Sequence, residues 1–240
     1  MVQEQSCTEQ LDQLKKEFDE FAYIVSHDFK APIRAISNLS SWIEEDLGEN
    51  ASEDILENMR LLRNRATRLE HMIEALLRYS RVSRFDLVPT QTDANNLVSK
   101  IAAGLPPHVQ VNVPTPLPSF YTYSNKLQDV LHHLMVNAAT FSNSEQPVIT
   151  VTCTDMNPDY YEFAVSDNGV GVPADVLDKI FNLFYTVSSK DLYDTVGAGL
   201  AISKKIVQFV QGSIHAEQNA GHGLKVKFTW PKTINATTTP

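Results

Sequence analysis

Apolar residues recur along the first fifth of the chain at alternating steps of three and four. This a/d spacing predicts a long amphipathic helix that lies against a partner helix. Phe29, Ile36 and Ile43 widen the apolar stripe beyond what one partner helix would cover. The stripe itself consists of Leu11, Leu14, Phe18, Phe21, Val25, Pro32, Ala35, Leu39 and Trp42.

A second helix with the same spacing follows after a short loop. Gly48 predicts the end of the first helix, and Asn50 with Glu53 predicts a capping box at the start of the second. The second apolar stripe runs from Ile55 to Ser80. Because each stripe is too wide for one partner, we expect two such hairpins to associate as a homodimer with a four-helix bundle.

The periodicity changes after Arg84, where helical and strand patterns begin to alternate. Asp93 predicts the N-cap of a helix that runs to about Ala103, and helical spacing returns at 127–141 and 200–210. Strand patterns occupy 148–154, 160–167, 213–218 and 224–230, whereas residues 106–118 are rich in proline. This mixture predicts an α+β sandwich in which helices pack on one face of a mixed sheet.

We therefore expect a multidomain chain. An all-α helical hairpin occupies 1–84, an α+β domain occupies 85–232, and a disordered tail follows at 233–240. The 240 residues suffice for two modest domains, and 42% hydrophobic with 20% charged residues is typical of globular proteins.

Charge and cysteine content exclude several classes of function. A formal net charge of -9 argues against nucleic acid as a partner, and it implies that a bound nucleotide would arrive with a metal ion. The apolar runs are too short to span a bilayer. Cys7 and Cys153 are too few for a disulfide framework or a zinc site, so we expect a reducing, cytoplasmic setting.

A histidine–aspartate pair, His27 and Asp28, lies on the first helix, and the heptad places His27 at solvent-facing position c. An adjacent carboxylate can hold the proton on one imidazole nitrogen and leave the other nitrogen as a nucleophilic lone pair. Pro32 gives no N–H to the Asp28 carbonyl and costs a helix interior about 3 kcal/mol, so it loosens the helix near His27. An ordinary surface histidine is the alternative interpretation. The face of His27 continues, as a surface for a docking partner, at Ala31, Arg34, Asn38 and Ser41.

The segments SHDFKAP and LLRYSRV resemble the dimerization and phosphoacceptor module of two-component sensor histidine kinases. The surrounding residues are most similar to the kinases attached to phytochrome and PAS-type sensors. The resemblance implies that His27 accepts the γ-phosphoryl group of ATP and passes it to an aspartate of a response regulator. It also implies that Asp28 is the acid/base neighbour and Pro32 the helix kink. Ala31 has no hydrogen-bonding group where many relatives orient a water molecule, so we expect little phosphatase activity.

Two motifs in the second half can bind a nucleotide. Asn137, on the helix at 127–141, can offer its amide oxygen to Mg²⁺ and its NH₂ to phosphate. Asp167 follows a strand and can accept a hydrogen bond from the amine of adenine, whereas guanine presents an oxygen there. Gly169 and Gly171 let the backbone approach the base closely. Each motif alone is weak, because such sequences also fill ordinary turns.

A third motif, DTVGAGLAISKKIV, precedes and enters a helix. Gly197 and Gly199 supply flexible backbone just before a helix that begins at about Leu200, and the N-terminal N–H groups of that helix can face phosphate. In the preceding loop Phe181 and Phe184 are candidate anchors of a lid, and plain core packing is an equally good interpretation. Lys190 is the basic residue of that loop that could reach a phosphate.

In their order along the chain the motifs resemble the N box, first glycine box, F box and second glycine box of the GHKL-type ATP-binding domain of histidine kinases. The resemblance implies ATP and Mg²⁺ as cofactors and autophosphorylation as the activity. His133, Thr140 and Thr195 depart from the family pattern: His133 replaces the water-activating glutamate of related ATPases, and the other two replace a basic residue and a glycine. A catalytically weak dimeric pseudokinase or scaffold is therefore the alternative, and an ATP-driven clamp is disfavoured. The early heptads also lead us to expect a sensor domain upstream.

Overall fold

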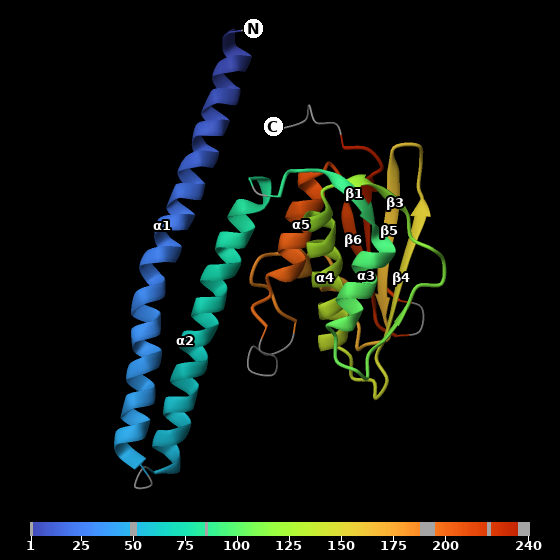
Figure 1. Ribbon diagram of the computed structural model, residues 1–240. Helices are drawn as coiled ribbons and strands as arrows, with labels where there is room; N and C mark the ends of the chain where they lie inside the picture. Colours follow the sequence, from blue (N-terminus) through green and yellow to red (C-terminus); the bar gives the residue numbers. More distant parts are fainter. Residues whose placement is uncertain (1, 49–51, 85, 188–194, 220–221, 235–240) are drawn as a thin grey trace. The chain divides into compact units, whose positions relative to one another are not determined.

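The computed structural model describes residues 2–48, 52–84, 86–187, 195–219 and 222–234, which group into two compact units (Figure 1). Of the described residues, the first unit contains those up to Arg81 together with 195–196, and the second contains the others. The domain limits expected from the sequence stay a prediction, and most of the expected tail, 235–240, lies outside the described residues. Within the described ranges, no helix is both long and apolar enough to cross a membrane.

The first unit is a helical hairpin of α1 (Val2–Leu47) and α2 (Glu53–Ser80). Gly48 has φ +52°, a left-handed conformation that ends α1 as the sequence predicted. The predicted capping box was wrong. Asn50 lies outside the described residues, and the N-cap is Ser52, whose hydroxyl oxygen accepts a hydrogen bond from the Ile55 N–H at 3.4 Å.

Small buried side chains let the two helices approach each other closely. Ala22 and Ser26 of α1 are almost fully buried, as is Ala66 of α2. The Ser40 hydroxyl donates to the Met59 carbonyl across the hairpin at 3.2 Å. Ion pairs between the helices fix their register further, and they join Lys30 to Glu74, Arg34 to Glu70 and Arg63 to Glu44.

Most of the predicted α1 stripe faces away from the hairpin contact, whereas the α2 stripe does so only in part. Phe21 is 62% exposed and Trp42 is 58% exposed, values that are unusual for large apolar side chains. Pairing α1 with α2 therefore leaves most of the α1 stripe and part of the α2 stripe uncovered. The exposed members are Leu14, Phe18, Phe21, Phe29, Ile36, Leu39, Trp42 and Ile43 of α1, and Ile55, Leu62 and Leu69 of α2.

The second unit is a mixed sheet with helices on one face, which confirms the predicted fold class (Figure 1). The five strands are arranged in the order β2-β4-β5-β7-β6, in which β2 and β4 are parallel and the other neighbours are antiparallel. These strands are β2 (Gln110–Asn112), β4 (Val148–Asp155), β5 (Tyr160–Asp167), β6 (Ile214–Gln218) and β7 (Leu224–Pro231). The helices are α3 (Ala94–Ala103), α4 (Ser124–Thr140) and α5 (Gly199–Phe209).

The core lies between these helices and one face of the sheet. Phe163 and Val165 of β5 are buried, and Phe163 stacks on Phe228 of β7 with ring centroids 5.3 Å apart. Because side chains alternate along a strand, Asp167 points to the same face as these two residues. The end of β5 thus directs a carboxylate toward the helical layer.

Three short strands were missed by the sequence analysis. β1 (Thr90–Asp93) pairs antiparallel with β3 (Ser119–Thr122), and β2 lies inside the proline-rich passage. The indole N–H of Trp230 donates to the Thr122 hydroxyl at 2.8 Å and ties this ribbon to β7. The predicted cap of α3 was correct, because the Asp93 carboxylate accepts from the Asn95 N–H at 2.9 Å.

Candidate functional site

The His27 imidazole lies on the solvent side of α1, where its side chain is 75% exposed. Its Nδ1 atom is 3.0 Å from Oδ1 of Asp28. An ionised carboxylate only accepts hydrogen bonds, so the proton of the neutral imidazole belongs on Nδ1. This tautomer leaves the Nε2 lone pair free to attack an electrophile.

Pro32 and the expected docking residues follow this histidine along α1. α1 continues through Pro32, which can give no N–H to the Asp28 carbonyl. Ala31 and Asn38 are exposed. Arg34 is exposed and donates to Glu70 at 2.8 Å, whereas the half-buried Ser41 hydroxyl donates to the Ser37 carbonyl.

The Asp167 carboxylate is held by two backbone groups from different elements. Its Oδ1 accepts from the Gly169 N–H at 2.9 Å and from the Leu224 N–H at 3.0 Å. Burial raises the pKa of the Asp167 carboxyl, and these two hydrogen bonds oppose that rise. Among the described residues, Oδ2 has no hydrogen-bond partner, so it can accept one from a ligand.

The two glycines after Asp167 place this loop between the end of α4 and the β6–β7 turn. A Cβ on Gly169 would lie 2.8 Å from the Phe141 carbonyl oxygen. Gly171 has φ +71°, and a Cβ there would lie 3.1 Å from the Gly223 carbonyl oxygen. Both positions exclude larger residues, so the loop can keep its path only with glycine.

The β6–β7 turn contains residues that the sequence analysis did not assign to the site. The Asn219 side-chain amide donates to the Asp167 carbonyl at 2.8 Å. Gly223 has φ +100°, and a Cβ there would lie 2.0 Å from the Asp167 carbonyl oxygen. The Gly-His-Gly stretch before the last strand was the available signal, because glycines at such a spacing indicate close backbone approach.

Gly223→Ala is expected to displace Asp167 and weaken nucleotide binding by about tenfold, because a methyl group cannot occupy space 2.0 Å from a carbonyl oxygen. The measurement is calorimetric titration with a non-hydrolysable ATP analogue. Gly104→Ala is the matched control, since a Cβ there would lie 3.5 Å from its nearest neighbour. Unchanged affinity in Gly223→Ala would contradict the inference that the β6–β7 turn holds Asp167 in position.

α4 carries three of the predicted residues on successive turns. The Asn137 side chain is half-buried and makes no hydrogen bond within the described part of the chain. Thr140 is half-buried, and its hydroxyl donates to the Val136 carbonyl at 2.8 Å. His133 faces α5, where its Nδ1 lies 3.4 Å from the Ser203 hydroxyl.

The start of α5 is held by the loop that precedes it. Gly197 has φ +71°, and a Cβ there would lie 2.4 Å from the Tyr185 carbonyl oxygen. The Phe184 N–H donates to the Gly197 carbonyl at 2.9 Å. Gly199 begins α5 and Leu200 follows, so the unpaired N–H groups of the first turn lie here.

For the other described residues of the expected site, the structure gives burial and backbone conformation. Phe181 is buried, which favours its interpretation as core, and Phe184 is half-buried with φ +65°. Thr195 is half-buried. Lys190 lies outside the described residues, so its expected contact with phosphate stays a prediction.

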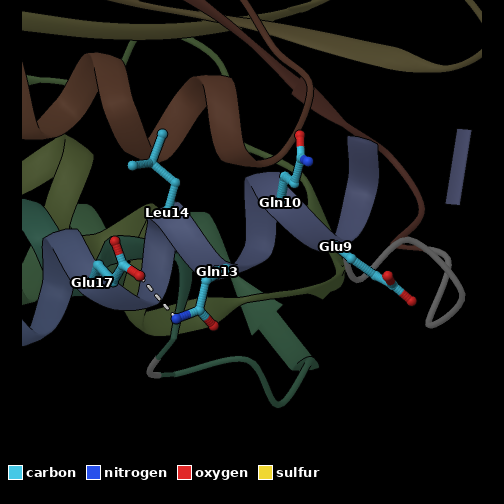
Figure 2. Close-up of a pocket in the computed structure, with 5 residues that line it drawn as sticks. All are labelled: Glu9, Gln10, Gln13, Leu14 and Glu17. Atoms are coloured by element: carbon cyan, nitrogen blue, oxygen red, sulfur yellow. Dashed lines mark hydrogen bonds between the residues drawn. The ribbon is translucent and has the colours of Figure 1, made fainter. Parts of the chain in front are cut away.

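A hollow along the first turns of α1 lies apart in sequence from these residues. Figure 2 shows the side chains that line it, with the Gln13 amide donating to the Glu17 carboxylate at 2.9 Å. It contains none of the residues predicted to bind a nucleotide. The lining residues are Glu9, Gln10, Gln13, Leu14 and Glu17.

Two family profiles match the chain. Residues 19–84 match the His Kinase A (phospho-acceptor) domain, and residues 122–234 match the Histidine kinase-, DNA gyrase B-, and HSP90-like ATPase. The hairpin with His27 and the domain with Asp167 thus each correspond to a separate profile.

Curated proteins show the same two-part similarity. The chain is 33% identical over 226 residues to Cyanobacterial phytochrome B of Nostoc sp., covering 92% of this chain and 30% of the relative. It is 27% identical to Sensor protein kinase WalK of Staphylococcus haemolyticus, covering 93% of this chain and 38% of the relative. The chain spans about a third of the length of the curated relatives it matches first.

Solved structures share the fold. Full-length ShkA in complex with AMPPNP has a TM-score of 0.65 at 22% identity, covering 90% of this chain and 47% of that chain. Histidine kinase ThkA in complex with response regulator protein TrrA has a TM-score of 0.62 at 19% identity, covering 94% of this chain and 66% of that chain.

The hairpin and the sheet domain together define a phosphoacceptor module followed by an ATPase domain of the kind found in histidine kinases, DNA gyrase B and HSP90. The chain belongs to the two-component sensor histidine kinases, of which it carries the transmitter module. The expected resemblance to the phytochrome kinases is confirmed.

Proposed function

We propose that this chain is an ATP-dependent protein histidine kinase that phosphorylates itself on His27 and transfers the phosphoryl group to an aspartate of a response regulator. The observation that carries the proposal is the exposed imidazole with its Nδ1 held by Asp28. A histidine in this arrangement is a nucleophile that a phosphoryl donor can reach.

The chemistry follows from the tautomer. Nε2 of His27 attacks the γ-phosphorus of ATP, an N–P bond forms, and the bond from that phosphorus to the bridging oxygen breaks as ADP leaves. The proton stays on Nδ1, and the Asp28 carboxylate stabilises the positive charge that develops on the ring. In the second step an aspartate oxygen of the regulator attacks the phosphorus, and His27 leaves as the neutral imidazole.

The second unit offers the groups that ATP requires. Oδ2 of Asp167 can accept from the adenine amine, and the N–H groups at Gly199 can face the phosphates. Mg²⁺ prefers oxygen ligands and is often held by one protein side chain together with substrate phosphates. The side-chain oxygen of Asn137 fits that role, and the ion would offset the negative charge of the phosphates.

Incubation with γ-labelled ATP and Mg²⁺ tests this function against the pseudokinase alternative. We expect incorporated label that is lost in acid and stable in alkali, as an N–P bond requires. Nucleotide binding without label would instead favour a scaffold, with Thr140 and Thr195 as the residues that weaken phosphate binding. Thr140→Lys is the variant that would then recover labelling.

Transfer to a regulator is the second part of the proposal. The face of α1 beside His27, with Ala31, Arg34, Asn38 and Ser41, is the proposed docking surface. Support comes from the complex that ThkA forms with a response regulator protein, because that kinase shares this fold. An upstream sensor domain stays a prediction.

We also propose that two copies of the hairpin form a four-helix bundle. The double variant Phe21→Glu/Leu39→Glu is expected to weaken the dimer at least about 100-fold, because burying unpaired carboxylates is strongly unfavourable. Light scattering coupled to size-exclusion chromatography measures the mass. Val88→Glu/Tyr121→Glu is the matched control, since both side chains are exposed in the second unit. A dimer that persists in the stripe variant would refute the bundle.

A further inference from the structure

Beside His27, an aromatic ring stacks on the imidazole and is itself approached by an arginine. Neither contact has a role in the chemistry proposed above. The rings of Tyr23 and His27 are stacked, with centroids 6.3 Å apart and planes 24° from parallel. The Arg81 guanidinium lies 5.7 Å from the centroid of the same Tyr23 ring. All three residues belong to the hairpin unit.

We propose that Tyr23 is a positioning residue for phosphotransfer to His27, and that Arg81 holds the Tyr23 ring in place. This inference rests on the proposed role of His27 as phosphoacceptor. Tyr23 and Arg81 are not proposed to touch the phosphoryl group. They act by restricting the orientation of the imidazole.

Tyr23 lies one turn before His27 on α1, and residues four apart on a helix are neighbours on its surface. Asp28 holds the Nδ1 edge of the imidazole at 3.0 Å. That contact alone leaves the ring free to tilt about the hydrogen bond. A second ring stacked on one face removes this freedom, so that Nε2 keeps one direction of attack.

The backbone of this turn is already fixed by packing. Ala22 and Ser26, on either side of Tyr23, are 1% and 0% exposed, and the Ser26 hydroxyl donates to the Ala22 carbonyl at 2.6 Å. Tyr23 itself is 53% exposed, so its ring is not held by burial. The side-chain contacts of Tyr23 are therefore what decides where the ring lies.

Arg81 supplies such a contact from the other helix. It is the C-cap of α2, where its N–H donates to the Leu77 carbonyl, and its guanidinium approaches the Tyr23 ring from that anchored position. A cation near an aromatic ring is attracted to it, and Arg makes this interaction more often than Lys. The contact links the end of α2 to the turn of α1 that precedes the phosphoacceptor.

The test is autophosphorylation of the full chain at saturating Mg-ATP, with the KM for ATP determined for each variant. Tyr23→Leu is expected to lower the maximal rate about fivefold without changing KM, whereas Tyr23→Phe keeps the ring and the wild-type rate. Arg81→Met is expected to lower the rate about threefold, and Arg81→Lys to restore most of it. Arg78→Met, which removes the same charge one turn earlier, is the matched control.

An NMR measurement separates positioning from general destabilisation. The imidazole proton resonances of His27, assigned by their loss in His27→Gln, are expected to shift in Tyr23→Leu and to stay in Tyr23→Phe, because a stacked ring shields them. Unshifted resonances in Tyr23→Leu, or an unchanged maximal rate, would overturn the inference. A wild-type chain that takes no label would overturn the proposed function itself. A labelled wild type with an unaffected Tyr23→Leu variant would overturn only the positioning role.

Discussion

Replacing His27 with glutamine is expected to reduce phosphoryl incorporation to background, a loss of at least about a thousandfold. A glutamine amide nitrogen has no basic lone pair, so it cannot attack phosphorus as an imidazole does. The exposed side chain lies outside the core, and glutamine favours helix, so the fold is expected to persist. Nucleotide affinity is expected to remain unchanged, because Asn137, Asp167 and Gly199 lie in the other unit.

The measurement is incorporation from γ-labelled ATP, followed by acid and alkali treatment and by calorimetric titration of nucleotide. His215→Gln is the matched control, since His215 is exposed on β6 of the second unit and takes the same substitution. Label that remains in His27→Gln at the wild-type level would mean that another residue is the phosphoacceptor. The kinase assignment would then survive while the site assignment fails.

The helical half of the fold could be predicted because its signals are local. The a/d spacing predicted both hairpin helices, although α1 begins at Val2, well before the first stripe residue Leu11, and Gly48 ended α1 as expected. The cap of α2 was misplaced from Ser52 to Asn50, because both residues are good caps and the choice depends on the path of the loop. The sequence also indicated that one partner helix would leave part of each apolar stripe exposed, because each stripe is wider than one helix covers.

The short strands could not be predicted, because the contacts that stabilise them are not local in the sequence. β1 and β3 have four residues each, and their pairing joins Thr92 to Phe120 across a helix and a proline-rich loop. β2 has three residues and pairs in parallel with β4. So few residues give no reliable alternation, and the pairing that stabilises them depends on distant parts of the chain.

The candidate nucleotide site likewise contains some residues that a local motif reveals and others that only the folded sheet brings together. Asp167, Gly169 and Gly171 are adjacent in sequence, so their motif was visible. Asn219 and Gly223 contact Asp167 only because β5 and β7 pair in the sheet, which no local pattern reveals. The contact between Tyr23 and Arg81 is hidden in the same way, because the two residues come from different helices of the hairpin and are far apart in the sequence.

Asp167→Asn is expected to weaken ATP binding about 100-fold, which corresponds to about 2.7 kcal/mol, and to abolish discrimination against GTP. The carboxylate has one oxygen committed to the Gly169 and Leu224 N–H groups and the other available to the adenine amine. An asparagine has a single oxygen for both tasks. If that oxygen stays with the backbone donors, its NH₂ meets the adenine amine, and if it turns to adenine, its NH₂ meets the two N–H groups.

Titration calorimetry with non-hydrolysable ATP and GTP analogues in the presence of Mg²⁺ measures both effects. Asp159→Asn is the matched control, because Asp159 is exposed in the turn between β4 and β5 and takes the same substitution. A melting temperature close to that of the wild type would confirm that the variant is folded. Because each orientation of the amide sets one donor against another, unchanged ATP affinity in Asp167→Asn would show that the adenine amine does not bind Asp167. The base would then have to be recognised by other groups of the domain.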